Sequence, residues 1–129
     1  MSLKDALVAG LDAVPECQTI CYVDMSSGLV LASQGRSRRP QEFYDKIASL
    51  AAGFLQSATM VEMAKSMAIA TEPDTSPCIC LFGGDQTHVF VKAKSFPEHA
   101  ICYMCSPTVN PDALSAAVME NREIVANAM

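Results

Sequence analysis

Two short segments of this chain are apolar at every position. They span Ile20–Val23 and Ile101–Cys105, and their β-branched and aromatic side chains favour extended strands. Successive side chains of a strand point to opposite faces of a sheet, so a sheet with one face in water shows a polar residue at every second position. Neither segment does so. We therefore expect a sheet that is covered on both faces, which places it between two layers of helices.

Capping and turn signals set the order of the other elements. Ser2 and Asp5 form a capping pair before an apolar helical pattern, and Pro15 ends that helix. Asn110 with Pro111 is another favourable helix start. The expected helices are 3–13, 41–69 and 113–127, and the expected strands are 18–23, 29–33, 78–82, 87–94 and 100–105. This order is α-β-β-α-β-β-β-α, and tight turns between successive strands make the central five-stranded sheet antiparallel.

Length and composition fit one domain. The chain has 129 residues, of which 50% are hydrophobic and 18% charged, so it can bury a core and is not disordered. Its net charge of −5 argues against a nucleic-acid partner, because phosphate binding needs a positive surface. No apolar run reaches the roughly 18–20 residues that cross a bilayer, and the start of the chain does not resemble a signal peptide. We expect a single domain, residues 1–129, in the cytoplasm and without a membrane partner.

The helix expected at 41–69 carries two apolar stripes. The bulkier stripe is expected to pack on the sheet and consists of Phe43, Ile47, Leu50, Phe54, Ala58 and Val61. The second stripe has the alternating spacing of a helix–helix seam and consists of Ser49, Gly53, Gln56, Met60, Met63 and Met67. Small residues let two backbones approach, and methionine adapts to contact surfaces. We interpret this stripe as a homodimer interface; cover by the chain's own loops is the alternative.

The third expected strand is a second candidate for the same interface. Residues Cys78–Phe82 are apolar, so we expect them at a sheet edge, paired with the same strand of a second copy. Pro77 limits how far this pairing extends. Ile79 and Leu81 are the residues assigned to the interface here, and we expect their amides to be protected from hydrogen exchange in the dimer.

Three features together resemble the roadblock/dynein light-chain family over nearly the whole chain. They are the helix start Leu7-x3-Leu11-x2-Val14, the hairpin from Val23 to Ala32, and the Ala/Leu-rich long helix. The hairpin motif Asp-x3-Gly-Leu-Val-Leu is one residue longer than the family's Asp-x-x-Gly form.

The resemblance implies a profilin/roadblock-like fold, with the long helix on one face of the sheet and the terminal helices on the other. It also implies dimerisation through the long helix and the third strand, and a regulatory or scaffolding role rather than catalysis. The implied partner is a small Ras-like GTPase, or a larger assembly in which the chain is a light chain. The alternatives are a small-ligand sensory domain of a related three-layer fold and a zinc- or thiol-dependent protein.

The six cysteines lie in apolar stretches, and we interpret them as reduced, buried core residues. Zinc coordination by Cys17, Cys21, Cys102 and Cys105 is the alternative. Cys102 and Cys105 are three positions apart in a strand and so point to opposite faces, which disfavours that site. The two histidines belong to no known catalytic motif. We therefore expect no catalytic residue, no metal and no cofactor.

One polar loop, before the long helix, carries the basic cluster Arg36, Arg38 and Arg39. Guanidinium groups bind carboxylates and phosphates, so this loop is a candidate contact for an acidic or phosphate-bearing partner. A solvated loop without a partner is the alternative.

Overall fold

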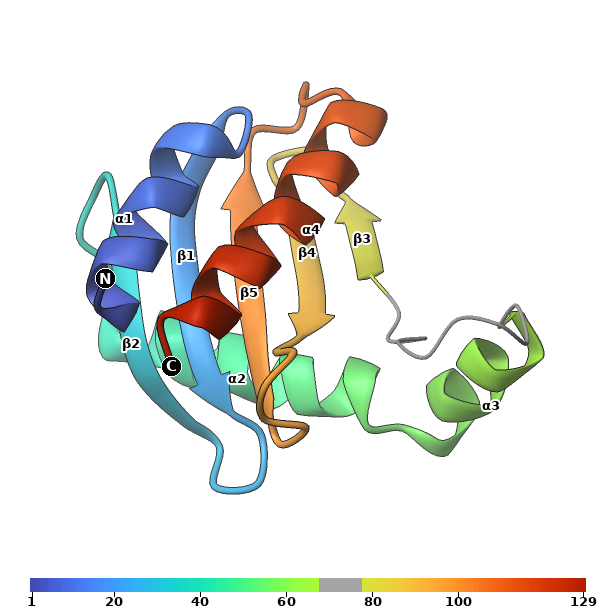
Figure 1. The fold of residues 1–129 in the computed structure, drawn as a ribbon. Helices are drawn as coiled ribbons and strands as arrows, with labels where there is room; N and C mark the ends of the chain where they lie inside the picture. Colours follow the sequence, from blue (N-terminus) through green and yellow to red (C-terminus); the bar gives the residue numbers. More distant parts are fainter. Residues whose placement is uncertain (68–77) are drawn as a thin grey trace.

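The computed structural model describes residues 1–67 and 78–129, apart from the side chains of residues 64 and 67, and its elements form three layers (Figure 1). The strands are β1 (Cys17–Asp24), β2 (Leu29–Gly35), β3 (Cys78–Phe82), β4 (Thr87–Lys92) and β5 (His99–Cys105). The helices are α1 (Leu3–Ala13), α2 (Gln41–Leu55), α3 (Ala58–Met67) and α4 (Pro111–Asn127). The strands form one antiparallel sheet in the order β2-β1-β5-β4-β3, which confirms the expected α-β-α class. Pro77 lies outside the described residues.

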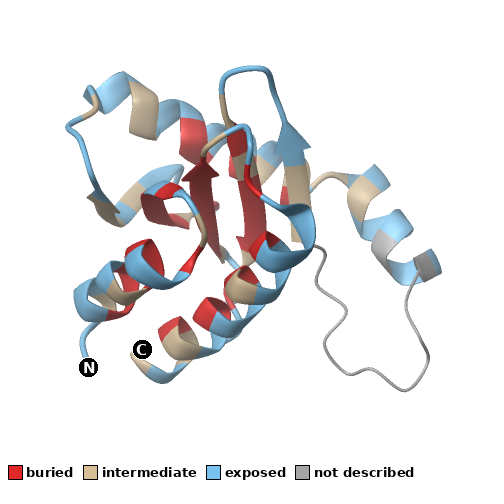
Figure 2. Ribbon diagram, turned by 90° about the horizontal axis from the view of Figure 1, so that it is seen from above, coloured by how far each residue is buried: buried red, intermediate tan, exposed pale blue. Residues whose placement is uncertain are grey.

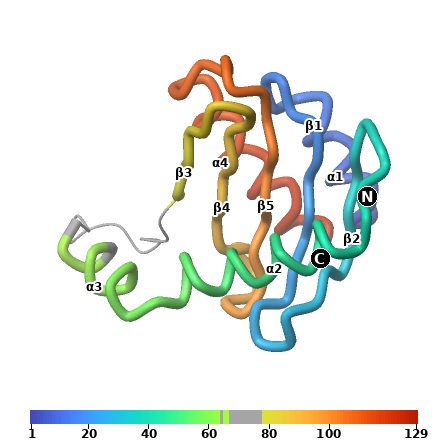
Figure 3. The backbone as a smooth tube through the Cα atoms, turned by 180° about the vertical axis from the view of Figure 1, so that it is seen from behind, coloured from blue at the N-terminus to red at the C-terminus, as the bar shows by residue number. Residues whose placement is uncertain are grey.

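Each face of the sheet has its own apolar core, visible as the buried parts of the strands and helices in Figure 2. On one face, Leu7 of α1 and Leu114 of α4 share a cluster with Tyr22 of β1. On the other face, Ile47 of α2 shares a cluster with Phe90 of β4 (Figure 3). Strands β1 and β5 contribute side chains to both clusters. This explains why the segments Ile20–Val23 of β1 and Ile101–Cys105 of β5 are apolar at every position, and it confirms the expected division of the helices between the faces.

The local start and stop signals act as predicted. The Oγ of Ser2 accepts a hydrogen bond from the amide of Asp5 at 3.1 Å, and the Asp5 carboxylate accepts one from the Ser2 amide at 3.2 Å. Asn110 caps α4 by accepting from the amide of Ala113 at 3.0 Å. Gly28 has a φ of 72° in the β1–β2 turn, a conformation that glycine adopts without strain. These features mark the starts of α1, β2 and α4.

The helix expected over 41–69 is interrupted. α2 ends at Leu55, and α3 starts at Ala58. Ser57 lies between them, and its Oγ accepts a hydrogen bond from the amide of Met60 at 3.2 Å. Serine favours such a helix start because its hydroxyl satisfies an amide that has no partner within the helix. The prediction of one continuous helix is therefore wrong at Ser57.

The residues of α2 that pack on the sheet also differ from the expected ones. Its buried residues are Ile47, Ala48, Ala51 and Leu55. Leu50 and Val61 are each 37% exposed, so their assignment to the sheet-facing stripe is wrong. The small side chains of Ala48 and Ala51 let the helix lie close to the strands, where close packing is favourable. A search for bulky apolar residues misses this preference.

Candidate interaction surface

β3 forms one edge of the sheet, as predicted, with β4 on its inner side (Figures 1 and 3). No other strand in the described part of the chain pairs with its outer side. Leu81 and Phe82 are 40% and 55% exposed, and the strand contains no charged residue. Sheet edges usually carry charges or prolines that block pairing, so an open, uncharged edge invites another strand.

The hydrogen-bond phase of β3 decides which of its amides face the open edge. The amide of Gly83 bonds to the carbonyl of Gln86 at 2.9 Å, and bonded pairs alternate with non-bonded pairs along an antiparallel ladder. Ile79 and Leu81 therefore bond to β4, whereas the amide of Cys80 points outward. Protection of the Ile79 and Leu81 amides arises within one protomer, so the expectation that it reports dimerisation needs correction. Their side chains remain interface candidates.

The expected dimer stripe divides between two helices. Its described members are half-buried or exposed: Ser49, Gly53, Gln56, Met60 and Met63. A Cβ atom built on Gly53 meets no described atom within 4 Å, so the backbone there is open to a close approach. The side chain of Met67 lies outside the described residues. Because Ser57 separates α2 from α3, the stripe is not the straight seam that was expected, although its described members are not part of the buried core.

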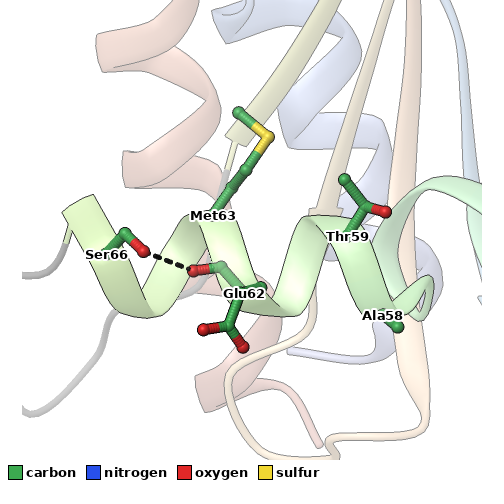
Figure 4. A pocket seen from close by; sticks show the side chains of 5 residues that line it. All are labelled: Ala58, Thr59, Glu62, Met63 and Ser66. Carbon is green, nitrogen blue, oxygen red and sulfur yellow. Dashed lines mark hydrogen bonds between the residues drawn. The ribbon is translucent and has the colours of Figure 1, made fainter.

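α3 projects past the β3 edge, away from the three-layer body (Figures 1 and 3). Among the described elements, α2 is the one that it contacts appreciably. An open pocket of about 560 Å³ lies along it, lined by Ala58, Thr59, Glu62, Met63 and Ser66. Figure 4 shows Met63 and Thr59 on one side of the helix and the Glu62 carboxylate on the other. A helix with an uncovered apolar side is typical of a contact surface.

Arg36 is tied into the fold. Its Nε donates to the carbonyl of Cys17 at 2.9 Å, and its Nη2 donates to the carbonyl of Leu11 at 2.8 Å. The guanidinium also lies 3.8 Å from the carboxylate of Asp12. Arg36 thereby joins the end of α1 to the start of β1. The other two loop arginines are not held by such carbonyl bonds within the described residues, so they are better placed for contacts with a partner.

The four buried cysteines form two cross-strand pairs, one on each face of the sheet. Cys17 lies opposite Cys105 on the α1 and α4 side, and Cys21 lies opposite Cys102 on the α2 side. Cys102 and Cys105 thus point to opposite faces, as predicted. Burial raises the pKa of Cys21 to about 12, and the hydrogen bond with Cys105 lowers the pKa of Cys17. Among the described residues, no group of three or more His, Cys, Asp or Glu side chains could hold a metal ion.

Sequence reasoning missed a partly buried polar pair between β1 and β5. The Tyr22 hydroxyl and Nδ1 of His99 share a hydrogen bond of 2.8 Å, and the ring centroids of His99 and Phe96 are 5.0 Å apart. Burial raises the pKa of Tyr22 to about 12. The two partners are 77 positions apart in the sequence, so no local pattern predicts the contact. It joins the ends of β1 and β5.

Comparisons with known proteins identify the fold. No protein-family model matches the chain, and no curated protein matches it. The Roadblock/LC7 domain from Streptomyces avermitilis has a TM-score of 0.72 at 12% identity, over 98% of this chain and 97% of that chain. Gliding protein MglB from Thermus thermophilus has a TM-score of 0.71 at 17% identity, over 98% and 87% of the two chains. MglB in a tetrameric arrangement has a TM-score of 0.71 at 16% identity, over 98% and 86%.

These likenesses define the class of the fold, which is the three-layer fold of the roadblock/LC7 domains. In particular, the arrangement is similar to that of MglB over almost the whole of this chain. The fold implied by the hairpin and helix motifs is thereby confirmed. No helix in the described ranges is long and apolar enough to span a membrane.

Proposed function

We propose that this chain is a homodimeric regulatory module that binds a small Ras-like GTPase and has no catalytic site of its own. The observation that carries the proposal is the open, uncharged edge of β3 together with the α2–α3 surface. This surface consists of half-buried and exposed residues, namely Ser49, Gly53, Gln56, Met60 and Met63. In a lone protomer, the edge of β3 leaves backbone hydrogen-bonding groups unpaired, and the α2–α3 surface leaves apolar side chains in contact with water. Burial of such apolar surface against a partner is favourable.

A two-fold axis near β3 brings both features into one interface. Antiparallel pairing of β3 with its copy uses the outward amide of Cys80 and joins the two sheets. α3, which projects beyond β3, then reaches toward the partner protomer, where Met60 and Met63 gain apolar contacts. MglB, which is similar in fold, occurs in a tetrameric arrangement, and this supports self-association of the present chain.

The GTPase partner is supported by the roadblock-like motifs of the sequence together with the fold. A dimer related by a two-fold axis presents the same patch twice, so two copies of α2 form one broad surface near the axis. Leu50 on α2 is 37% exposed and adds an apolar contact there. If the chain is instead a light chain in a larger assembly, the same surface binds a different partner.

A small-ligand sensory function is less well supported. It needs space between the sheet and α2, and the cavity at that place includes Phe43, Ile47 and His88 in its lining. Its volume is about 10 Å³, which is the space of about one water molecule. The protomer therefore has no room for an organic ligand at this described position, and this favours the interaction role.

The dimer is tested by sedimentation velocity on matched methionine variants. Met60→Glu places a charge in the proposed interface and is expected to give a folded monomer, as is Gly53→Leu. Met119→Glu is the control, because Met119 is 38% exposed on α4, in the opposite layer. It is expected to remain dimeric, and circular dichroism checks that each variant is folded. A monomeric wild type at high concentration, or an equal loss of dimer in both glutamate variants, contradicts the proposal.

The partner is tested separately. The purified dimer is titrated calorimetrically with Ras-like GTPases of the same genome, each loaded with GDP or with a non-hydrolysable GTP analogue. We expect one of them to bind with an affinity that depends on the nucleotide, and Met60→Glu to weaken that binding. If no GTPase binds while the chain is dimeric, the GTPase assignment is wrong and the light-chain role is preferred.

A further inference from the structure

We propose that the loop between β2 and α2 is a binding site for the phosphate group of a small phosphate monoester. An open pocket of about 500 Å³ lies there, and its lining includes Ser33, Ser37, Arg38, Arg39 and Tyr44. This site is separate from the β3 edge, since β2 and β3 lie at opposite ends of the sheet (Figure 3).

The charge of the lining is the first argument. Three arginines line the pocket, and its described lining contains no acidic residue. The whole chain has a net charge of −5, so this positive surface is a local feature. Asp12 lies 3.8 Å from Arg36 and offsets that arginine, which is also held by backbone carbonyls. The charges of Arg38 and Arg39 have no ion-pair partner among the described residues.

The second argument is an unsatisfied donor. The Nε of Arg39 is buried and has no hydrogen-bond acceptor within the described part of the chain. Its guanidinium lies over the ring of Phe43, 5.1 Å from the centroid, which restricts where the group can point. A buried charged donor without an acceptor is unfavourable. Arg39 also lines the pocket, so a small rotation of its guanidinium toward a bound anion gives this donor an acceptor.

The start of α2 adds further donors. Its N-cap is Pro40, and no described side chain caps the helix. The amide of Phe43 already bonds to the carbonyl of Pro40 at 3.0 Å, so the amides of Gln41 and Glu42 are the ones at this helix start without a partner in the helix. The positive end of the helix dipole lies there and favours anions, although the Glu42 carboxylate in the first turn offsets part of it. Ser37 and Tyr44, which carry hydroxyl groups, are also among the lining residues. Together these groups match the several acceptor oxygens of a phosphate better than a single carboxylate.

The size of the pocket points to an ester rather than to inorganic phosphate. Its volume of about 500 Å³ lies within the range of about 300–1,000 Å³ that is typical of organic ligands. The aromatic ring of Tyr44 offers a surface on which an organic group can pack. Phenyl phosphate is therefore the probe of choice, with inorganic phosphate as the smaller comparison.

The test is a titration of the full chain with phenyl phosphate, followed by amide chemical shifts and by calorimetry. We expect shifts at residues 33–44 and weaker binding of inorganic phosphate. The double variant R38Q/R39Q removes two charges from the pocket and is expected to weaken binding by about tenfold or more. The control K4Q/K46Q removes two charges from exposed sites outside the pocket lining and is expected to change binding by less than about twofold.

The absence of shifts at residues 33–44, or an equal loss in both double variants, overturns the site. Tighter binding of a phosphoserine peptide than of phenyl phosphate also overturns it, because the natural ligand is then a modified protein. Sedimentation of R38Q/R39Q is expected to match that of the wild type. Failure of the phosphate site therefore leaves the proposed dimer untouched, and the two proposals are judged independently.

Discussion

Gly10 of α1 lies directly against the side-chain amide of Asn121 of α4. A Cβ atom on Gly10 would lie 2.8 Å from both Nδ2 and Oδ1 of Asn121, and 2.6 Å from Cδ1 of Ile20. The amide is fixed, because its Oδ1 accepts from the Tyr103 hydroxyl at 2.6 Å and its Nδ2 donates to the carbonyl of Ala6 at 3.2 Å. The close approach of α1 to α4 over the sheet therefore depends on the missing side chain of Gly10.

Replacement of Gly10 by alanine is expected to destabilise the protein. Overpacking costs about 1–3 kcal/mol, and the gain in helix propensity offsets up to about 1 kcal/mol. A net loss of about 1–2 kcal/mol in the free energy of unfolding is expected from urea denaturation. Gly84→Ala is the matched control, since a Cβ atom there meets no described atom within 4 Å. Equal stability of the two variants contradicts the packing argument.

Replacement of Arg36 by alanine is expected to loosen the end of α1. The change removes two charge-assisted hydrogen bonds, to the carbonyls of Leu11 and Cys17. The side chain of Arg36 is 51% exposed, so solvent weakens these hydrogen bonds. We therefore expect a loss of about 1–2 kcal/mol in the free energy of unfolding, which is a small effect for two charge-assisted hydrogen bonds. Arg38→Ala, in the same loop, is expected to leave thermal unfolding unchanged. If both variants unfold at the wild-type temperature, the Arg36 contacts do not stabilise the fold.

The parts of the fold that could be predicted are those set by neighbouring residues. The capping pair of Ser2 and Asp5 and the glycine turn at Gly28 act within a few positions, so the sequence shows them directly. The break between α2 and α3 at Ser57 could not be predicted, because apolar residues continue at helical spacing on both sides of it. The apolar pattern indicates burial, and it does not indicate whether one helix or two carry it.

The candidate site was predictable only in outline, because its details depend on contacts between distant elements. The edge position of β3 follows from the family's strand order. The direction of the Cys80 amide depends instead on the hydrogen bond between Gly83 and Gln86, which sets the phase of the ladder. The role of Arg36 depends on carbonyls 19 and 25 positions away, which only the assembled fold brings within reach.

Hydrogen exchange on β3 is expected to separate pairing within a protomer from pairing between protomers. The Cys80 amide points to the open edge and should exchange slowly in the dimer and faster in Met60→Glu. The Ile79 amide bonds to β4 and should exchange at a similar rate in both. Exchange is measured by NMR on the wild type and the variant. Rapid exchange of Cys80 in the wild-type dimer means that the interface contains no continuous sheet.

The buried thiols make the fold sensitive to alkaline pH. Burial raises the pKa of Cys21 to about 12, whereas a thiol in an unfolded chain ionises near pH 8.5. Between these values the unfolded state has lost the proton and the folded state retains it, so a rise in pH favours unfolding. Burial also raises the pKa of Cys102, which lies opposite, and the two effects have the same sign. Stability is therefore full below about pH 8.5 and falls above it.

This pH dependence is measured by urea unfolding between about pH 8 and about pH 10.5, with a reductant that keeps the thiols free. Each buried thiol contributes a slope of up to about 1.4 kcal/mol per pH unit. Cys21→Ala lowers the stability at neutral pH, because it leaves a small cavity, and its stability should fall less steeply as the pH rises. Thr87→Val is the control, since it changes a buried residue of β4 that does not ionise in this range. Its slope should equal that of the wild type. A slope for Cys21→Ala as steep as that of the control shows that Cys21 does not hold its proton in the folded state.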